Sequence, residues 1–408
     1  MMLPKLIIVK AHSKTYPIPL QNKKANKHPT SWFNTTENLI HTISDTDEYI
    51  LRCKKVNITF TPKQKEIIDP WFDIYKSTYN QTVKHIRKGG KNLKTGFYNL
   101  RTEVKSEFTE DFKKRMTKCH IPVHTVDNAI KDVSKAWKSA FGLAKITKRR
   151  FRIRYKRDTS TDTIVLESQS FSKEKNSFSK YVGEVVSSEP INGLKHDCRL
   201  QKNKNGYILF VPENIPTKIN PNKKNIISLD PGLRAYQTGY VLNKDKTVEC
   251  VEYGSNFIDE IKPIFKRIKP DTPRIRKYNQ RLYNKIRHKI DDLQWKLAKE
   301  LASGYNTVVI GNLSTKKVLS KDQLYGETKN LLNLASHYRF RQRLKSKCEE
   351  YGTKFVEQDE SYTSKTCGSC GEINYTLGKS KLFTCPCGFR IDRDINGARN
   401  ILIKSKIK

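Results

Sequence analysis

Residues 226–232 read Ile226-Ile227-Ser228-Leu229-Asp230-Pro231-Gly232, an apolar run that ends in an aspartate and a tight turn. Two further strand-like segments follow, over residues 236–242 and 248–253. Three strands in succession, with an acid at the end of the first, predict the start of a ribonuclease-H-type α/β fold. We therefore expect Asp230 at the edge of a sheet, where its carboxylate can hold a divalent cation.

A long helix is predicted next. Apolar residues recur at helical spacing from Ile275 to Leu301, and Gly304 follows as a helix stop. Arginines and lysines occupy the other faces of this helix. Residues 307–310, Thr-Val-Val-Ile, then predict a buried strand of the same sheet, which the chain reaches by a helical crossover.

The C-terminal region contains two cysteine pairs. Cys367 and Cys370 form the first, Cys385 and Cys387 the second, and 14 residues separate them. This spacing is close to the one by which four thiolates enclose a tetrahedral zinc ion. Free or redox-active thiols are the alternative, but they do not explain why a glycine follows each pair, at Gly371 and Gly388. The other five cysteines are scattered singly, which disfavours a disulfide framework.

A helix is predicted directly after the second cysteine pair. The sequence there reads Asp392-Arg393-Asp394-Ile395-Asn396-Gly397-Ala398, with an acid at the mouth of the helix and two small residues inside it. Small residues allow a helix to approach a sheet closely. We expect this helix to bring a second carboxylate beside Asp230.

The charge of the chain predicts a polyanionic partner. Lys and Arg number 79 against 41 acidic residues, a net charge of +38 at pH 7. Residues 148–157 predict a strand with one buried face, formed by Phe151, Ile153 and Tyr155, and one cationic face. We predict nucleic-acid contact from the basic side chains of this segment, Arg149, Arg150, Arg152, Arg154 and Lys156.

The first half of the sequence predicts a mixture of helices and strands. Residues 1–47 suggest a flexible extension, and residues 48–60 a strand before the helix cap Thr61-Pro62. Helices are expected over 61–149, the first of them kinked or broken at Pro70. Strands within residues 150–222 then complete a small β-barrel around the helical insertion. A proline-rich linker over residues 216–224 leads into the second domain, 223–408.

No run of about 18 apolar residues occurs, and the apolar run near the N-terminus is too short for a signal peptide. We therefore expect a soluble, intracellular protein that needs no membrane.

Three motifs together resemble the RuvC and zinc-ribbon core of the TnpB family of transposon-encoded nucleases, relatives of the type V CRISPR effectors. They are the Asp230-Pro231-Gly232 turn, the Thr363-Ser364-Lys365-Thr366-Cys367 entry to the ribbon, and the Asp392–Asn400 segment. The resemblance implies a RuvC nuclease domain over residues 223–408 with a zinc ribbon inserted at 363–390. It also implies a wedge domain split between residues 48–60 and 150–222, and a helical recognition domain at 61–149.

The same resemblance assigns catalytic, magnesium-binding roles to Asp230 and Asp394, and a local structural role to Asp392. The family's usual glutamate follows the strand at residues 307–310, where this chain has Gly311. The eukaryotic and giant-virus branch, called Fanzor, commonly lacks that glutamate and has another just before the Thr-Ser of the ribbon entry, which is Glu360 here. Hydrolysis with two metal ions needs about three carboxylates. Glu360 is thus predicted to complete the site.

By resemblance, the chain is expected to be an RNA-guided DNA endonuclease with two Mg²⁺ ions, one structural Zn²⁺ ion, a guide RNA and a double-stranded DNA target, and without a need for oligomers. Two alternatives remain open. One is a catalytically inactive nucleic-acid-binding relative, and the other is a transposition protein that joins DNA strands. Residence in the nucleus of a eukaryotic host is a further expectation, which imaging of a tagged protein can test.

Overall fold

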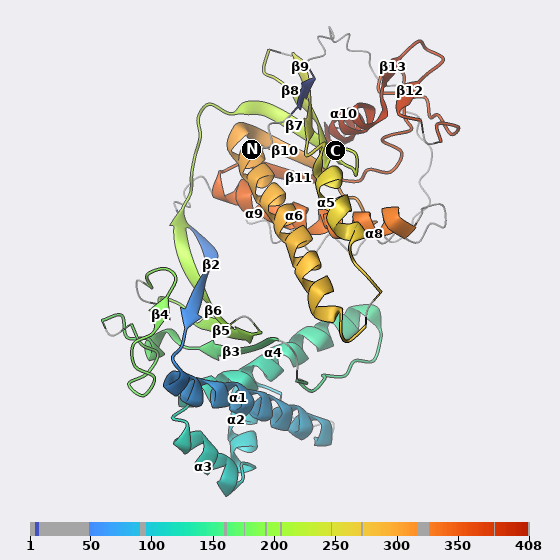
Figure 1. The fold of residues 1–408 in the computed structure, drawn as a ribbon. Coiled ribbons are helices and arrows are strands. Elements are labelled where there is room, and N and C mark those ends of the chain that lie inside the picture. Colours follow the sequence, from blue (N-terminus) through green and yellow to red (C-terminus); the bar gives the residue numbers. More distant parts are fainter. Residues whose placement is uncertain are drawn as a thin grey trace. The chain divides into compact units, whose positions relative to one another are not determined.

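The computed structural model describes residues 5–7, 49–89, 95–158, 161–174, 176–191, 194–204, 206–245, 247–270, 272–315, 326–378 and 380–406. The chain divides into two compact units. Unit 1 comprises Met1–Ile50 with Pro216–Lys408, and unit 2 comprises Leu51–Ile215. Figure 1 shows the elements of both units. No helix in the described ranges is both long and apolar enough to span a bilayer.

Unit 1 is built on a six-stranded mixed sheet with the order β1-β9-β8-β7-β10-β11. Its strands are β1 (Lys5–Ile7), β7 (Lys224–Pro231), β8 (Gln237–Leu242), β9 (Val248–Tyr253), β10 (Tyr305–Gly311) and β11 (Lys354–Gln358). The strands β7, β8 and β9 pair antiparallel in succession, whereas β10 lies parallel to both β7 and β11. The predicted run of three strands and the buried crossover strand are therefore confirmed.

Helices cover both faces of this sheet. They are α5 (Phe257–Lys266), α6 (Arg276–Gly304), α8 (Gly326–Ala335), α9 (His337–Glu350) and α10 (Arg393–Lys406). Val308 and Ile310 of β10 belong to a core with the buried stripe of α6, whereas Val309 packs with Ile401 of α10. Alternate residues of one strand thus face different helices, as the two-residue period of a strand requires. The predicted helix before Gly304 is confirmed.

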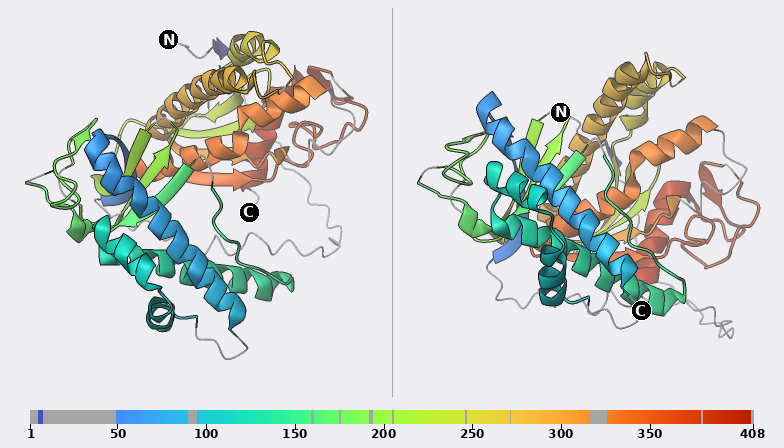
Figure 2. Two further views of the ribbon diagram at one scale, coloured as in Figure 1. Left: turned by 60° about the horizontal axis from the view of Figure 1, so that its bottom comes forward. Right: turned by 90° about the horizontal axis from the view of Figure 1, so that it is seen from below.

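Over the residues that the structure describes, unit 2 contains a five-stranded sheet and four helices. The sheet order is β3-β5-β6-β2-β4, formed by β2 (Tyr49–Thr59), β3 (Thr161–Leu166), β4 (Val186–Ser187), β5 (Cys198–Asn203) and β6 (Gly206–Pro216). The helices are α1 (Pro62–Lys88), α2 (Phe97–Ser106), α3 (Glu110–Lys118) and α4 (Val123–Thr147), and a short 3-10 turn, η2, covers Ser168–Ser170. The helices α1 and α4 pack side by side (Figure 2).

The described strands of unit 2 do not close into the expected β-barrel. The strands β3 and β4 remain the two edges of the sheet in these ranges. Closure would require β4 to pair with β3, but β4 has only two residues and α4 packs against β3. Among the described strands, β4 pairs with β2 alone.

The predicted break at Pro70 is wrong, because α1 continues through this residue. Thr61 caps the helix with a full capping box to Gln64, as its sequence predicts. Proline leaves the carbonyl four residues earlier without a donor, and Glu66 is exposed, so water can satisfy that carbonyl. Burial of Trp71 and its neighbours outweighs the lost hydrogen bond. The aromatic residues Trp71, Phe72 and Tyr75 of this helix lie in the core.

Two other expectations need correction. Residues 1–47 were expected to have no fold, yet Lys5–Ile7 form β1 and pair antiparallel with β9, whose edge would otherwise be open. The remainder of that segment lies outside the described residues. The predicted linker is also anchored, because the ammonium of Lys223 is buried and donates hydrogen bonds to Tyr351 O (2.5 Å) and Thr353 Oγ1 (2.7 Å).

Candidate metal and nucleic-acid sites

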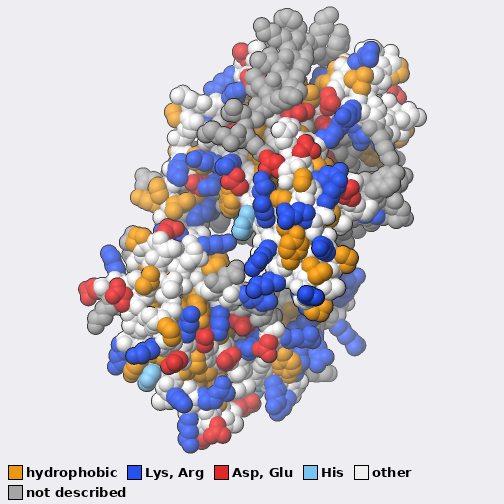
Figure 3. Space-filling model, in the orientation of Figure 1, with side chains coloured by type: hydrophobic (Ala, Val, Ile, Leu, Met, Phe, Trp, Pro, Cys, Tyr) orange, Lys and Arg blue, Asp and Glu red, His pale blue; other side chains and the backbone are white. Residues whose placement is uncertain are grey.

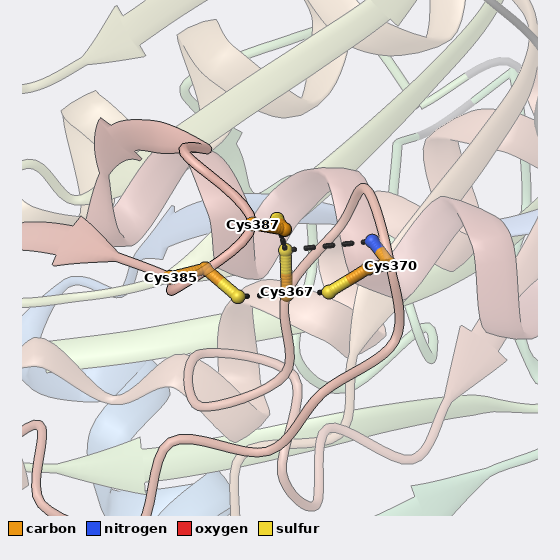
Figure 4. Close-up of side chains that lie close together, drawn as sticks. All are labelled: Cys367, Cys370, Cys385 and Cys387. Carbon is orange, nitrogen blue, oxygen red and sulfur yellow. Dashed lines mark hydrogen bonds between the residues drawn. The ribbon is translucent and has the colours of Figure 1, made fainter.

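The four cysteines converge in a small subdomain that contains β12 (Leu382–Thr384) and β13 (Arg390–Asp392). Their Sγ atoms all lie within 4.8 Å of one another (Figure 4). The Cys367–Cys387 and Cys370–Cys385 sulfur pairs are 3.8 and 3.5 Å apart. Zinc bonds of about 2.3 Å in a tetrahedron place sulfurs about 3.8 Å apart. The predicted convergence is confirmed, and its geometry supports a zinc ion.

Two glycines shape the loops that carry these sulfurs. Gly371 has φ +83° and Gly388 has φ +86°, conformations that disfavour a side chain. The turn before Gly371 directs the backbone amides of Ser369 and Cys370 toward the Cys367 sulfur, at 3.4 and 3.5 Å. The amide dipoles stabilise a thiolate at this position. This is the role that the sequence predicts for a glycine after each cysteine pair.

Asp230, near the end of β7, lies under the helix α10. A Cβ atom added to Gly397 would come within 2.4 Å of the Asp230 carboxylate, so only glycine fits there. Ser228 lies two residues before Asp230, on the same face of β7, and donates a hydrogen bond to the carbonyl of Ala398 at 2.7 Å. The two small residues allow the close approach that the sequence predicts.

Glu360 occupies the space above Gly311. It follows β11, the neighbour of β10, and its Oε2 atom would be 2.7 Å from a Cβ atom at position 311. The glutamate at 360 therefore places its carboxylate where a side chain at the end of β10 would begin. Within the described structure, Glu360 Oε2 is buried and has no hydrogen-bond partner.

The third acid, Asp394, begins α10. Its carboxylate forms an ion pair with Arg234 at 2.9 Å, and this arginine lies in the turn after Asp230. Asp392 instead caps the helix, because its Oδ1 accepts hydrogen bonds from the amides of Asp394 (2.7 Å) and Ile395 (3.3 Å). The local structural role predicted for Asp392 is thus confirmed.

The pKa values show that the three carboxyl groups are crowded. Burial and the charges of Glu360 and Asp394 raise the pKa of Asp230 well above its usual value. Burial raises the pKa of Glu360 to about 7, although Arg341 opposes the shift. Burial also raises the pKa of Asp394, and Arg234 opposes that shift. Burial and nearby acids therefore disfavour the charged forms of these carboxyl groups, and a bound cation would offset this effect.

The carboxylates are less tightly gathered than the thiols. Across the described ranges, the four cysteines are the only group of three or more His, Cys, Asp or Glu side chains close enough together to hold a metal ion. Asp230, Glu360 and Asp394 come together from β7, the segment after β11 and α10, but Asp394 turns toward Arg234. Their catalytic roles stay a prediction.

Two arginines beside these acids were not foreseen from the sequence. Arg234 is one, and its only signal was its position four residues after Asp230. Arg341 of α9 is the other. It is 8% exposed and donates a hydrogen bond to Leu313 O, in the loop that follows β10, at 3.0 Å. Its only signal in the sequence was the absence of an acidic residue four positions later, where Lys345 stands.

The predicted basic strand is an irregular segment. Residues 148–158 contain no strand, because their backbone pairs with side chains instead: Asn80 exchanges hydrogen bonds with both backbone groups of Lys156 (2.8 and 3.0 Å). Phe151 and Ile153 are half-buried and Arg152 and Arg154 exposed, as predicted. At Tyr155 and Lys156 the predicted alternation is wrong. Tyr155 is exposed, and the Lys156 ammonium lies over the Tyr75 and Tyr79 rings.

Other basic side chains line α6. The first half of this helix, up to Lys289, contains no acidic residue, and most of its Lys and Arg side chains are exposed. On the face shown in Figure 3, basic side chains gather along the helix. A phosphate backbone is the kind of ligand that this surface fits.

The chain is a mixed α/β protein in which a four-cysteine metal site interrupts the path from the sheet to its last helix. Residues 337–401 match the family model "Cas12f1-like, TNB domain". Two TnpB-like proteins of Acanthamoeba polyphaga mimivirus are 30% and 31% identical over 382 residues, which cover 86% of this chain and 72% of each relative. The chain belongs to the TnpB-like protein family.

Two weaker similarities were also found. A protein of Streptomyces pristinaespiralis, described as a candidate RNA-guided DNA endonuclease, is 34% identical over 124 residues, or 30% of each chain. A cryo-EM structure of a Cas12f1–sgRNA–target DNA complex matches with a TM-score of 0.34 and 16% identity, over 86% of this chain and 98% of that one.

Proposed function

We propose that this chain is an RNA-guided DNA endonuclease of the Fanzor type, with a ribonuclease-H-type nuclease site formed by Asp230, Glu360 and Asp394. The observation that carries the proposal is the position of Glu360, whose carboxylate fills the space over Gly311 at the end of β10. A site that lost a glutamate from one strand has a glutamate from the neighbouring strand in its place. The rearranged site therefore keeps three acids.

The residues of this site fit divalent cations. Glu360 Oε2 is buried without a partner, and the pKa values of all three carboxyl groups are raised. Carboxylate oxygens are the ligands that Mg²⁺ prefers. Asp230, Glu360 and Asp394 would hold the cations, which supply water activation and stabilisation of the leaving oxygen in phosphodiester hydrolysis. Arg234 can exchange its ion pair with Asp394 for a DNA phosphate.

The remaining parts would bind the nucleic acids. The basic face of α6 and the exposed Arg149, Arg150, Arg152 and Arg154 can contact phosphates, while base pairing between guide and target reads sequence. Lys156 is better assigned to positioning its segment, because its ammonium is occupied by two tyrosine rings. Relatives with RNA-guided names support a guide RNA and a DNA target. In this proposal unit 2 supplies the wedge and recognition domains.

The test is a cleavage assay with the RNA that co-purifies from the native locus. We expect Mg²⁺-dependent breaks in a DNA that matches this RNA, and a loss of at least about 100-fold in the Glu360→Gln variant. Glu357→Gln is the matched control, because Glu357 lies on β11 but is 40% exposed on its side chain and pairs only loosely with Arg341 (3.8 Å).

Three outcomes would contradict the proposal. Undiminished cutting by Glu360→Gln removes this residue from the site. No cutting by the parent protein with its own RNA indicates an inactive nucleic-acid-binding relative. Joined DNA strands, in place of simple breaks, indicate a transposition protein.

A further inference from the structure

The C-terminal end of α4 exposes three large apolar side chains. Phe141, Leu143 and Ile146 are 46%, 59% and 64% exposed, whereas the buried residues of this helix all lie between Thr125 and Ser134. The last turns of α4 therefore contribute little to the core of unit 2. We call Phe141, Leu143 and Ile146 the α4 tip.

The α4 tip is held in a defined position. Lys148 ends the helix with φ +52° and turns the chain back. Phe151 then packs edge-on against the rings of Trp137 and Phe141, with centroids 5.0 and 6.3 Å apart. Farther along, Asn80 of α1 fixes the backbone of Lys156 by two hydrogen bonds. A fixed apolar surface loses little conformational entropy when it binds a partner.

The charged residues that neighbour the α4 tip in the sequence are all basic. Between Asp132 and Asp158 no acidic residue occurs, and every charged residue is Lys or Arg. Lys145 lies over the Phe141 ring at 4.8 Å, and the exposed Arg149 and Arg150 follow the helix directly. A partner that combines an apolar surface with dense negative charge complements these side chains.

The arrangement of the three side chains favours a base over a lipid. At 100° per residue, Phe141 and Leu143 point about 160° apart, and Ile146 points about 60° from Leu143 and about 140° from Phe141, so the three side chains are spread around the helix. They form a blunt end of the helix, whereas a helix on an anionic membrane needs one apolar stripe along its length. The face of a base pair is flat, apolar and bordered by phosphates. Phe, Leu and Ile are side chains that proteins place against such faces.

We infer that the α4 tip packs on the face of a nucleic-acid base pair, at a duplex end or at an opened step, while the neighbouring Lys and Arg neutralise its phosphates. The inference deepens the proposed function by adding contact with bases to the expected contact with backbone. It rests only on the nucleic-acid binding in that proposal and does not need the carboxylates to cut.

The test measures binding by the full chain carrying Asp230→Asn, so that cleavage plays no part. The probes are a short blunt-ended RNA–DNA hybrid and the same hybrid closed by loops at both ends. Replacing Phe141, Leu143 and Ile146 by Gln changes no charge. We expect about a tenfold loss of affinity for the blunt hybrid, with an unchanged salt dependence.

A matched control replaces three exposed aliphatic residues elsewhere, Leu51, Val123 and Val186, by Gln, and we expect less than about a twofold change from it. An equal loss with the closed hybrid supports an opened step, and a loss confined to the blunt hybrid supports a duplex end. Unchanged affinity for both probes overturns the inference. If the Gln variant of the α4 tip has a lower melting temperature than the parent but the same affinity for both probes, the α4 tip packs within the protein and the inference is wrong.

Further results distinguish this inference from membrane binding and from a failure of the proposed nuclease function. If vesicles of phosphatidylserine bind the parent chain, and the Gln variant loses only that binding, the partner is a membrane and the inference is wrong. If the parent chain never cuts DNA, the binding result still stands, because the assay uses a silenced chain. Conversely, unchanged affinity in the α4 tip variant leaves the carboxylate site untouched.

Discussion

The thiol site and the carboxylate site, both in unit 1, are assembled in different ways. The four cysteines lie between residues 367 and 387, and two turns with positive-φ glycines bring their sulfurs together. The three acids lie at residues 230, 360 and 394, and meet only because a helix and two strands pack closely. Local turns determine the first site, and space left by Gly311 and Gly397 determines the second. The thiol site should therefore tolerate no change of position, whereas the carboxylate site should tolerate one.

The largest effect is expected from breaking the thiol site. Cys370→Ser replaces a zinc ligand with a weak one, and structural zinc contributes about 10–16 kcal/mol in small zinc-binding peptides. We expect zinc to be lost and amide hydrogens of residues 366–392 to exchange fast, while β7 and β10 stay protected. Metal analysis and hydrogen exchange measure both. Cys53→Ser, outside the cluster, is the control, and a Cys370→Ser chain that retains zinc would falsify the site.

Moving a carboxylate sharpens the comparison. Glu360→Ala should reduce the rate of Mg²⁺-dependent cleavage by at least about 100-fold. The double variant that also carries Gly311→Glu should cut about tenfold faster than Glu360→Ala. Apart from Glu360, the nearest atoms to a Cβ atom at 311 are Ile401 Cδ1 at 3.1 Å and Pro231 Cδ at 3.2 Å, so a shift of a few tenths of an ångström in these side chains accommodates it. Gly311→Glu alone should gain nothing, because two glutamates then compete for one space.

The relocation has a clear failing outcome. A double variant that melts like the parent but cuts no better than Glu360→Ala would show that the carboxylate at 360 acts elsewhere than over Gly311.

Closing the space at α10 should have a somewhat smaller effect. Gly397→Ala places a methyl group within 2.4 Å of the Asp230 carboxylate, which must move or push the helix outward. A misplacement of about 1 Å at a catalytic group costs about 100-fold in rate. Gly304→Ala, with nothing within 4 Å, is the control and should cut normally. Equal rates for the two variants would mean that the contact with Asp230 is unimportant.

The contrast also explains what the sequence could predict. The strands β7 to β10, the helix α6 and the thiol site follow from patterns within short stretches, such as the apolar run at residues 307–310 and the two cysteine pairs. The position of Glu360 came from a family resemblance, because no short-range pattern connects residue 360 with residue 311. The clearance that Gly311 provides became visible only when β10 and β11 lay in register.

The corrected predictions have the same origin. Lys5–Ile7 pair with a strand more than 240 residues away, and no local pattern specifies a partner at that distance. The alternation of its neighbours in sequence predicts an exposed Lys156. Its ammonium lies instead over the rings of Tyr75 and Tyr79, which belong to a helix far away in the sequence. The β-barrel prediction was wrong because, among the described strands, the two-residue strand β4 pairs with β2 and not with β3. Each correction concerns a contact between segments far apart in the chain.

The smallest expected effect concerns stability without metal. The Glu360 pKa is raised from 4.5 to about 7 by burial, with Asp359 adding to the shift and Arg341 opposing it. A carboxyl whose pKa is higher in the folded state stabilises that state below the unfolded pKa, and this contribution is lost as pH rises through about 7. With chelator present, Glu360→Gln should therefore melt at a higher temperature than the parent at pH 8, by about 2–4 °C for each kcal/mol of added stability. At pH 4 the variant and the parent should melt at the same temperature.

Adding Mg²⁺ at pH 8 should reduce the difference in melting temperature, because a bound cation balances the buried charge of the parent. Equal melting temperatures for the variant and the parent at pH 8 without metal would show that the carboxylate at 360 is not buried as described. The carboxylate site would then no longer differ from the thiol site in this respect.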